Sequence, residues 1–400
     1  MNFLVVNCGS SSLNYKIYKT NSDGNLTKGI SGKAHRIGTH GQESSFVEHK
    51  YQDQNERFDV DLEDHKQAID NILQYVINQQ VRIDAIGHRI VHGGSQFKAS
   101  TILTPEVIQA FEACLPLAPI HNPNSYDVIK ACQIALPDVT QYLSFDTAFH
   151  ASLEPKVYTY ALPADLCKKA GLRKYGFHGL SYQYLSLKVP EILNISSSTL
   201  KMVACHLGTG GSSVAAIQGG KSLDTSMGYT PLAGMIMSTR CGDIDPAIPL
   251  LLINDYGYKA DQLSNIFNYQ SGLLGVSEVS SDLRDLIKLI EEKNNQKAEL
   301  AFNMYSYQLI KFIGAYMALL NGVDALVFTD DVGVQCRSLR KEVCQAFEWA
   351  GIDLDESVNN NNVFDVPTIV STSSSKISVI AMPTDEEHMI ALEGLKLIQS

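Results

Sequence analysis

The chain has 400 residues, 44% of them hydrophobic and 19% charged, which is typical of a globular protein with more than one hydrophobic core. Its formal net charge of -11 argues against non-specific binding to nucleic acid or to an anionic membrane. No apolar run is long enough to span a bilayer and no basic leader precedes residues 3–6, so we expect neither a membrane anchor nor a signal peptide. The eight cysteines are scattered without a CxxC pair, which predicts mostly buried thiols in a reducing cytoplasm.

Apolar, β-branched runs alternate with amphipathic stretches along the chain, a pattern that favours an α/β fold. The apolar runs predict strands at residues 3–6, 82–87, 202–205, 213–217, 324–328 and 377–381. The amphipathic stretches predict helices at residues 64–79, 105–112, 297–320 and 385–398. Thr384 followed by Glu387 predicts a capping box at the last helix. The polar run Asn359–Asn362 predicts a surface loop.

Two segments of the sequence repeat one pattern. Residues 3–18 and 202–217 each contain an apolar strand, a polar residue, a tight Gly/Ser loop and a second strand. Gly/Ser turns between strands are common, so either segment alone is compatible with coincidence. The shared order and spacing favour two related domains, with a boundary near residue 150, after SFDTAFH.

The two Gly/Ser loops are candidate anion sites. Such loops present backbone N–H groups and hydroxyls, and glycine lets a phosphate approach closely. Neither loop has the lysine of a Walker A sequence, and neither is a GxGxxG that opens a helix. Two such hairpins facing one another would be able to hold a polyphosphate.

Two arginines lie in glycine-punctuated loops rich in His and Asp. Arg89 lies in GHRIVHGG, directly after a predicted strand, and Arg240 lies in MSTRCGDIDP. A planar guanidinium suits both a small carboxylate and a phosphoryl group, although many arginines only form surface or structural ion pairs. Arg284 in SSDLRDL is equally compatible with a helix-face pair to Asp282 or Asp285.

Six histidines follow apolar runs: His88, His92, His121, His150, His178 and His206. None shows the spacing of a metal site, and most isolated histidines are structural. His178 in KYGFHGLSY is the best candidate to donate a hydrogen bond to a developing oxyanion. Asp146 in FDTAFH follows an apolar strand, where it could orient metal-bound water or act as a base; an aspartate that caps a turn is the alternative.

Together these motifs resemble the acetate kinase family. Ten motifs carry the resemblance, in order and over almost the whole chain: NCGSSSL, HRIVHGG, APIHNP, FDTAFH, YGFHG, HLGTGGSS, STRCGDIDPAI, SGLLGVS, DALVF and PTDEE. The resemblance implies the acetate and sugar kinase/heat-shock/actin (ribonuclease H-like) fold, with two duplicated domains around a central cleft, and a homodimer. One domain would be residues 1–150, completed by helix 385–400. The other, residues 151–384, would carry the donor-binding and dimerisation elements.

The resemblance also implies direct, in-line phosphoryl transfer with Mg²⁺ between acetate and acetyl phosphate and a phosphate donor, either ATP/ADP or pyrophosphate/phosphate. By motif, Asn7 and Glu386 would be linked to magnesium, Arg89 and Arg240 would hold the carboxylate and the phosphoryl group, and Asp146 would be the essential acid. His178 and Arg240 would stabilise the transition state. Because a carboxylate substrate is already ionised at neutral pH, we favour an orienting or metal-linked role for Asp146.

The resemblance assigns further residues to the two substrates. The methyl pocket would be lined by Val91, Ile120, Phe177 and Pro231. The donor would be bound by Asn14, His206, Leu207, Gly208, Thr209, Gly210, Asp282, Leu283, Arg284, Asp331, Val332 and Gly333. For Glu386, a first-turn carboxylate that favours the helix dipole remains an alternative to a metal ligand.

The sequence departs from the family pattern on the donor side. Asn14 replaces a lysine, Thr209 replaces an asparagine, and FTDDVGVQ replaces the glycine-rich FTGGIGEN. Asp330 and Asp331 add bulk and negative charge where the backbone should approach the nucleotide, which predicts weakened ATP binding. In this the chain resembles the pyrophosphate-using branch of the family.

Two other readings stay open at this point. A propionate or butyrate kinase would use the same chemistry with a larger pocket. A relative without activity that only binds a ligand would explain the altered donor loop, but the catalytic candidates are all retained: Arg89, Asp146, His178, Arg240 and Glu386.

Overall fold

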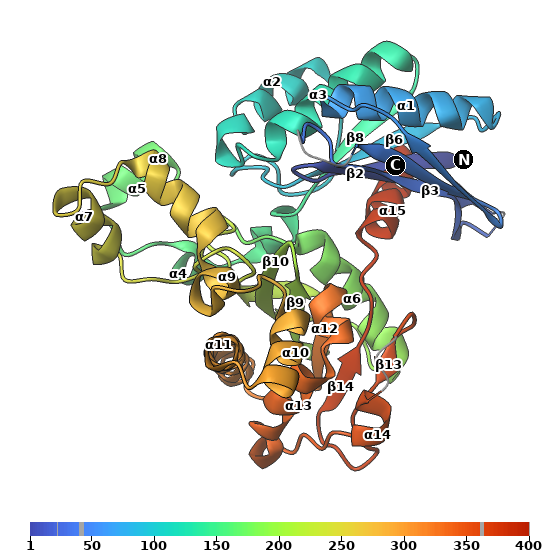
Figure 1. The fold of residues 1–400 in the computed structure, drawn as a ribbon. Coiled ribbons are helices and arrows are strands. Elements are labelled where there is room, and N and C mark those ends of the chain that lie inside the picture. The colour runs from blue at the N-terminus through green and yellow to red at the C-terminus, as the bar shows by residue number, and fades with distance from the viewer. Residues whose placement is uncertain (22, 40–43, 361–363, 400) are drawn as a thin grey trace. The chain divides into compact units, whose positions relative to one another are not determined.

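The computed structural model describes residues 1–21, 23–39, 44–360 and 364–399. The chain divides into two compact units, Met1–Phe149 with Asp385–Ser400 and His150–Thr384. Each unit is built around one β-sheet (Figure 1). Within the described residues, no helix is both long and apolar enough to cross a membrane.

The first unit contains an eight-stranded sheet with the strand order β5-β4-β3-β2-β1-β6-β8-β7. Strands β1, β6 and β8 run parallel, and the other neighbours pair antiparallel. The strand bounds are β1 Asn2–Cys8, β2 Ser12–Thr20, β3 Leu26–His35, β4 Phe46–Tyr51, β5 Gln54–Asp59, β6 Ala85–Ile90, β7 Thr101–Ile102 and β8 Thr140–Phe145.

Four α-helices belong to this unit: α1 His65–Asn78, α2 Pro105–Glu112, α3 Asn122–Ala135 and α15 Glu386–Gln399. Helix α1 begins where the Asp64 side chain accepts a hydrogen bond from the Gln67 N–H, and it packs on α3 over one face of the sheet. Helix α15 packs on the opposite face (Figure 1). Its close approach depends on small residues, because a Cβ at Gly87 or Gly394 would clash with the Tyr142 ring. The first turn of α15 is thereby held beside β1 and β2.

The second unit contains a six-stranded sheet in the order β11-β10-β9-β12-β14-β13. The strand bounds are β9 Lys201–Gly208, β10 Gly211–Gln218, β11 Lys221–Thr225, β12 Ala325–Thr329, β13 Thr368–Ile369 and β14 Ser378–Ala381. The helix bounds are α4 Pro155–Tyr158, α5 Ala164–Ala170, α6 Gly179–Leu193, α7 Ala247–Asn254, α8 Ala260–Asn265, α9 Gly272–Ser277, α10 Leu283–Lys293, α11 Gln296–Leu319, α12 Asp330–Gln335, α13 Arg337–Gln345 and α14 Glu356–Asn359.

The two sheets share one topology. The order β3-β2-β1-β6-β8-β7 corresponds strand for strand to β11-β10-β9-β12-β14-β13, with the same parallel and antiparallel pairings. The β1–β2 and β9–β10 hairpins, which the sequence repeat predicted, occupy equivalent places in the two sheets. The predicted α/β fold with duplicated sheets is therefore confirmed.

Most predicted elements match observed ones, and three local predictions differ from the structure. The strand predicted at residues 82–87 runs from Ala85 to Ile90, so Arg89 lies inside a strand and not after it. The hydroxyl of Thr384 does not cap α15, because Asp385 accepts from the His388 N–H and the Thr384 Oγ1 has no hydrogen-bond partner among the described residues. The run Asn359–Asn362 is not simply a surface loop, since Asn359 is buried, while residues 361–362 lie outside the described residues.

Candidate active site

In the first unit, three neighbouring strands bring polar side chains to one edge of the sheet. Asn7 lies near the end of β1, Arg89 near the end of β6, and Asp146 directly after β8. A backbone hydrogen bond from the Asp146 N–H to the Ile90 carbonyl fixes the aspartate beside the neighbouring strand. Because the carboxyl ends of parallel strands meet at the same edge, these residues come together although they are far apart in sequence.

Arg89 is the centre of this cluster. Its Nε and Nη2 donate to the two oxygens of Asp146 at 3.0 and 2.7 Å, a bidentate pair. Its Nη1 lies 3.1 Å from Asn7 Oδ1 and 3.1 Å from Glu386 Oε2. Burial by itself would lower the pKa of Arg89, but Asp146 and Glu386 outweigh it and raise the pKa. The guanidinium is thus held rigidly and stays charged.

The start of α15 adds two more carboxylates to the cluster, from Asp385 just before the helix and from Glu387 in its first turn. Glu387 accepts from Asn7 Nδ2 at 2.9 Å and pairs with Lys16 Nζ at 2.9 Å. Asp385 also pairs with Lys16 at 2.9 Å. Sequence reasoning missed Lys16, because its partners lie almost a whole chain length away. The only sequence signal for a cationic partner was the run of three acidic residues after Thr384.

The proposed metal ligands fit a hard cation. Asn7 Oδ1 and Glu386 Oε2 both lie 3.1 Å from Arg89 Nη1, so an amide oxygen and a carboxylate oxygen from two different elements lie near one another. Mg²⁺ is bound by one or two protein oxygens of this kind, with water and phosphate oxygens completing the octahedron. No cluster of three or more His, Cys, Asp or Glu side chains suited to a metal occurs within the described parts of the chain.

In the second unit, a histidine and an arginine converge on the glycine hairpin between β9 and β10. A Cβ atom at Gly211 would lie 3.1 Å from Arg240 Nη1 and 3.6 Å from His178 Nε2. His178 precedes α6 with a left-handed backbone (φ 58°), and its Nδ1 is hydrogen-bonded with Ser213 Oγ at 2.8 Å. Its ring stacks on that of His206, with 4.0 Å between centroids. A left-handed backbone conformation is costly for a residue other than glycine. Such strained residues are common at functional sites.

Arg240 differs from Arg89 in its partners. Across the described residues it forms no ion pair with a carboxylate, and the hydrogen bond of its guanidinium is to the Met237 sulfur at 3.7 Å. Burial lowers the pKa of Arg240. A half-buried guanidinium without a counter-ion is expensive, so an anion brought by a ligand would stabilise it.

The two aspartates that the sequence placed in the donor loop are the first residues of helix α12, and they contact the β9–β10 hairpin. Asp331 accepts hydrogen bonds from the Thr209 backbone N–H at 2.9 Å and from the Thr209 hydroxyl at 3.0 Å. Asp330 lies 3.1 Å from His206 Nε2 and presses against Gly208, with a left-handed backbone (φ 65°). Carboxylate oxygens therefore occupy donors that a phosphate would otherwise use.

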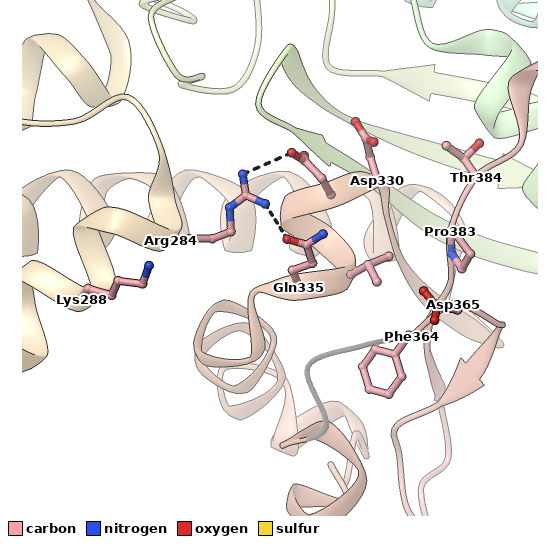
Figure 2. A pocket seen from close by; sticks show the side chains of 10 residues that line it. Arg284, Lys288, Asp330, Gln335, Phe364, Asp365, Pro383 and Thr384 are labelled. Atoms are coloured by element: carbon pink, nitrogen blue, oxygen red, sulfur yellow. Dashed lines mark hydrogen bonds and ion pairs between the residues drawn. The ribbon is translucent and has the colours of Figure 1, made fainter. Parts of the chain in front are cut away.

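A cavity of about 660 Å³ adjoins helix α12 (Figure 2). Arg284 reaches into it and pairs with Asp331 at 3.5 Å, and it donates to Gln335 (Figure 2). It also pairs with Asp282 at 2.6 Å, which is the structural ion pair that the sequence left open. The other residues around the cavity are Lys288, Asp330, Val334, Phe364, Asp365, Pro383 and Thr384.

The remaining predicted site residues fall into three groups. The side chains of Leu207, Leu283 and Val332 are buried in the core, so only their backbone and that of Gly333 can face a ligand, whereas Gly210 is open. Asn14 on β2 is the cross-strand partner of Asn7 in the first unit, whereas the other predicted donor residues belong to the second unit. The methyl-pocket residues are divided between the units: Val91 and Ile120 belong to the first, Phe177 and Pro231 to the second.

Of the histidines, only two belong to the second-unit cluster. His178 and His206 stack there, whereas His88 is hydrogen-bonded with Gln141 and His150 with Ser222 and the Phe177 carbonyl. The buried Asn122 is the first residue of α3; it follows His121 and donates to the His92 carbonyl. His88 and His150 are therefore assigned to the scaffold.

Two sheets of one topology, each with charged side chains at the carboxyl ends of its parallel strands, fit the phosphotransferase that the sequence predicts. The model of the acetokinase family matches residues 2–392. The acetate kinase of Clostridium novyi (strain NT) is 42% identical over 406 residues, which cover 100% of this chain and 99% of that protein. The acetate kinase of Dictyoglomus thermophilum is 43% identical over 100% of this chain and 99% of that protein. The chain belongs to the acetokinase family.

Solved structures agree with this assignment. The acetate kinase of Entamoeba histolytica superposes with a TM-score of 0.90 at 41% identity, covering 100% of both chains. The acetate kinase of Porphyromonas gingivalis gives 0.89 at 40% identity, covering 99% of both. A propionate kinase from Francisella tularensis gives 0.89 at 33% identity, covering 98% of both. The lower identity of the last makes it the weaker guide to the acyl substrate.

Proposed function

We propose that the chain catalyses reversible phosphoryl transfer between acetate and acetyl phosphate, by direct in-line displacement. The observation that carries the proposal is Arg240, a guanidinium without a carboxylate partner, placed with His178 beside the glycine hairpin. Phosphoryl transfer requires positioning and charge neutralisation more than covalent chemistry. An arginine that lacks an anion in the protein alone is suited to bind one supplied by the substrate.

The other residues have complementary roles in this proposal. Arg240 and His178 would donate to the oxygens of the transferring phosphoryl group, and Arg89 would bind the substrate carboxylate. Asp146 would orient Arg89 through the bidentate pair at 3.0 and 2.7 Å, which supports an orienting rather than a basic role. Asn7 and Glu386 would hold Mg²⁺, which supplies positive charge next to the phosphoryl oxygens when it is bound.

For the donor, we propose pyrophosphate and phosphate in place of ATP and ADP. The support is the position of the two aspartates: Asp331 takes the N–H and hydroxyl of Thr209, and Asp330 lies against Gly208. A nucleotide that crosses this part of the hairpin would meet two like charges and lose those donors. Arg240 and His178 are grouped at Gly211, so a short inorganic donor can use them without passing over Thr209.

One experiment tests both parts of the proposal. Purified protein is mixed with acetyl phosphate and Mg²⁺, and with either ADP or orthophosphate, and the ATP or pyrophosphate formed is measured. We expect pyrophosphate formation, with ATP formation at least about a hundredfold slower, the size of a loss of two or more good phosphate contacts. ATP formation alone would overturn the donor and leave the acetate chemistry intact. Binding of acetyl phosphate without either product would overturn the enzyme assignment itself.

We also propose that two copies of the chain form a homodimer through helix α7. None of its residues is buried, although it carries the run IPLLLIN, and Leu250 and Leu251 are 61% and 48% exposed. Tyr256, just after the helix, is 69% exposed. A second copy would cover this apolar surface. Analytical ultracentrifugation should give a dimer for the wild type and a monomer for Leu250→Asp/Leu251→Asp; a wild-type monomer at micromolar concentration contradicts the proposal.

A cytoplasmic location is proposed as well. All eight cysteines are thiols without disulfides, and six of them are buried. Thiols of this number are typical of proteins kept in a reducing compartment. Fractionation of cells that express the chain, with a periplasmic or secreted marker as the control, checks this location.

A further inference from the structure

Three consecutive acidic residues open helix α15, and each has different partners. Asp385 accepts from Lys16 and from the Tyr18 hydroxyl, both at 2.9 Å. Glu386 pairs with Arg89 at 3.1 Å. Glu387 binds Lys16 with one oxygen and Asn7 with the other, at 2.9 Å each. Acidic side chains at the N-terminus of a helix interact favourably with the helix dipole, but three together also repel one another.

The contact between Glu387 and Asn7 fixes which way the Asn7 amide faces. Asn7 Nδ2 donates to Glu387 Oε1 at 2.9 Å, so its Oδ1 is directed to Arg89 Nη1 at 3.1 Å. A flipped amide would direct two N–H groups at a guanidinium that can only donate, and it would leave Glu387 facing an oxygen. Only the observed orientation presents a carbonyl oxygen beside Glu386, which is the orientation that a Mg²⁺ ligand requires.

Lys16 in turn holds Glu387. It lies on β2, two residues beyond the Asn14–Asn7 pair of the β1–β2 hairpin and therefore on the same face of the sheet. Burial by itself would lower the pKa of Lys16, but Glu387 and Asp385 outweigh it and raise the pKa, so the ammonium is charged at neutral pH. Its side chain is only 25% exposed, which limits screening by solvent. It is the cation that keeps two neighbouring carboxylates in place.

We infer that Lys16 is a positioning residue for the phosphoryl transfer: through Glu387 it fixes the Asn7 carbonyl oxygen that holds the divalent cation. The inference rests on the proposed metal ligands, Asn7 and Glu386, and not on the identity of the phosphate donor. Without the ammonium, Glu387 lies beside Asp385 and Glu386 with no cation of its own. It then swings towards solvent and releases the Asn7 amide.

Lys28 provides a matched control. It lies on the neighbouring strand β3, is exposed, and interacts with Asp385 and Glu387 only through longer-range charge. Lys28→Met therefore removes the same charge from the same face of the molecule without removing a contact to Glu387. Lys16→Met removes charge and contact together, and Lys16→Arg keeps the charge.

The test uses Mn²⁺ as the probe, since it takes the same oxygen ligands as Mg²⁺ and its free concentration is measured by electron paramagnetic resonance. In Lys16→Met the dissociation constant for Mn²⁺ should rise about tenfold or more, the usual loss when a residue that orients a metal ligand is removed. Lys28→Met should stay within about twofold of the wild type, and Lys16→Arg should recover most of the affinity.

Steady-state kinetics give a second readout with whichever donor proves active. Lys16→Met should raise the KM for Mg²⁺ and lower kcat, while the KM for acetyl phosphate stays within about twofold, because Arg89 keeps its pair with Asp146. A folded Lys16→Met protein with wild-type Mn²⁺ affinity would overturn the inference, as would equal losses in the Lys16 and Lys28 variants. A wild type that forms pyrophosphate or ATP yet binds no Mn²⁺ would overturn the inference and the metal ligands, but not the proposed reaction.

Discussion

The two sheets have the same strand order, but the charges at their equivalent edges are arranged in opposite ways. At the β1–β2 edge, Arg89 is surrounded by oxygen ligands from Asn7, Asp146 and Glu386. At the β9–β10 edge, Arg240 has no carboxylate partner among the residues that the structure describes, while two aspartates bind the N–H and imidazole groups of the hairpin. The arginine of the first edge is thus paired with carboxylates of the protein, whereas the arginine of the second edge is not.

This difference separates what the fold provides from what the side chains add. Both hairpins present backbone groups at the carboxyl edge of parallel strands, as duplication requires. Burying an arginine with its carboxylates adds rigidity, whereas burying one without them costs free energy that a ligand anion can return. The stability of the first edge and the activity of the second should therefore respond differently to equivalent substitutions.

The largest effect is expected from Arg89→Ala. It leaves Asp146 and Glu386 buried without their cation, which typically costs about 3–5 kcal/mol of unfolding free energy, and turnover is lost as well. Arg82→Ala is the control, since it breaks an exposed pair with Asp84 that should contribute less than about 1 kcal/mol. Urea unfolding followed by circular dichroism measures both. Equal destabilisation by the two substitutions would mean that the first edge is not held by its charges.

Arg240→Ala should break activity without breaking stability. Turnover of acetyl phosphate should fall about 10³-fold, the range seen when an oxyanion donor is removed. The melting temperature should stay the same or rise, because no buried carboxylate loses a partner. Arg337→Ala, which removes an exposed arginine of the same unit, should change neither quantity. A melting temperature several degrees lower in the Arg240 variant would show that this guanidinium also stabilises the fold.

Acid should destabilise the first unit through buried neutral histidines. Burial lowers the pKa of His49 to about 4, where its ring stacks on Tyr75 at 3.7 Å and is hydrogen-bonded with Tyr15. In the unfolded chain the pKa is about 6.5, so the unfolded state binds more protons between pH 6.5 and 4, and stability falls with pH across this window by about 3 kcal/mol.

His49→Phe tests this sign. The substituted ring keeps the stacking on Tyr75 but cannot bind a proton. Unfolding free energies at pH 6.5 and 4.5 should therefore differ less in His49→Phe than in the wild type. His88, whose pKa burial also lowers to about 4, remains in both proteins and accounts for a common residual slope. An unchanged slope in the variant would place the acid sensitivity elsewhere.

The sequence predicted these edges unevenly, for physical reasons. Hydrophobic periodicity located the paired hairpins and Asp146, because a buried strand followed by a polar residue leaves a local signal. The strand at residues 85–90 was displaced, since Gly87, His88 and Arg89 are polar residues in a strand that is nevertheless buried. Local sequence also misplaced the cap of α15, where Asp385 and not Thr384 accepts the N–H.

Long-range partners were beyond the reach of sequence. Lys16 meets Asp385 and Glu387 only because α15 returns to β2 from the far end of the chain. The FTDDVGVQ motif indicated altered charge at the donor loop, but nothing local predicted that Asp331 would bind Thr209. Residue types can be read locally, whereas their pairings depend on topology.

The smallest effect is expected from Asp330→Gly/Asp331→Gly, which should make the second edge an open phosphate loop. Glycine adopts the left-handed backbone of residue 330 (φ 65°) at lower cost, and removal of the Asp331 carboxylate makes the donors of Thr209 available. ATP formation from ADP and acetyl phosphate should rise about tenfold, the factor equivalent to one good hydrogen bond to a charged group.

The variant Asp330→Asn/Asp331→Asn separates bulk from charge. Because it keeps the side-chain volume beside Gly208 and removes only the negative charges, it should recover a smaller part of the ADP activity. Recovery equal to that of the glycine variant would assign donor choice to charge alone. If neither variant gains ADP activity while both still form pyrophosphate, the aspartates do not select the donor, and the contrast between the two edges has no part in donor specificity.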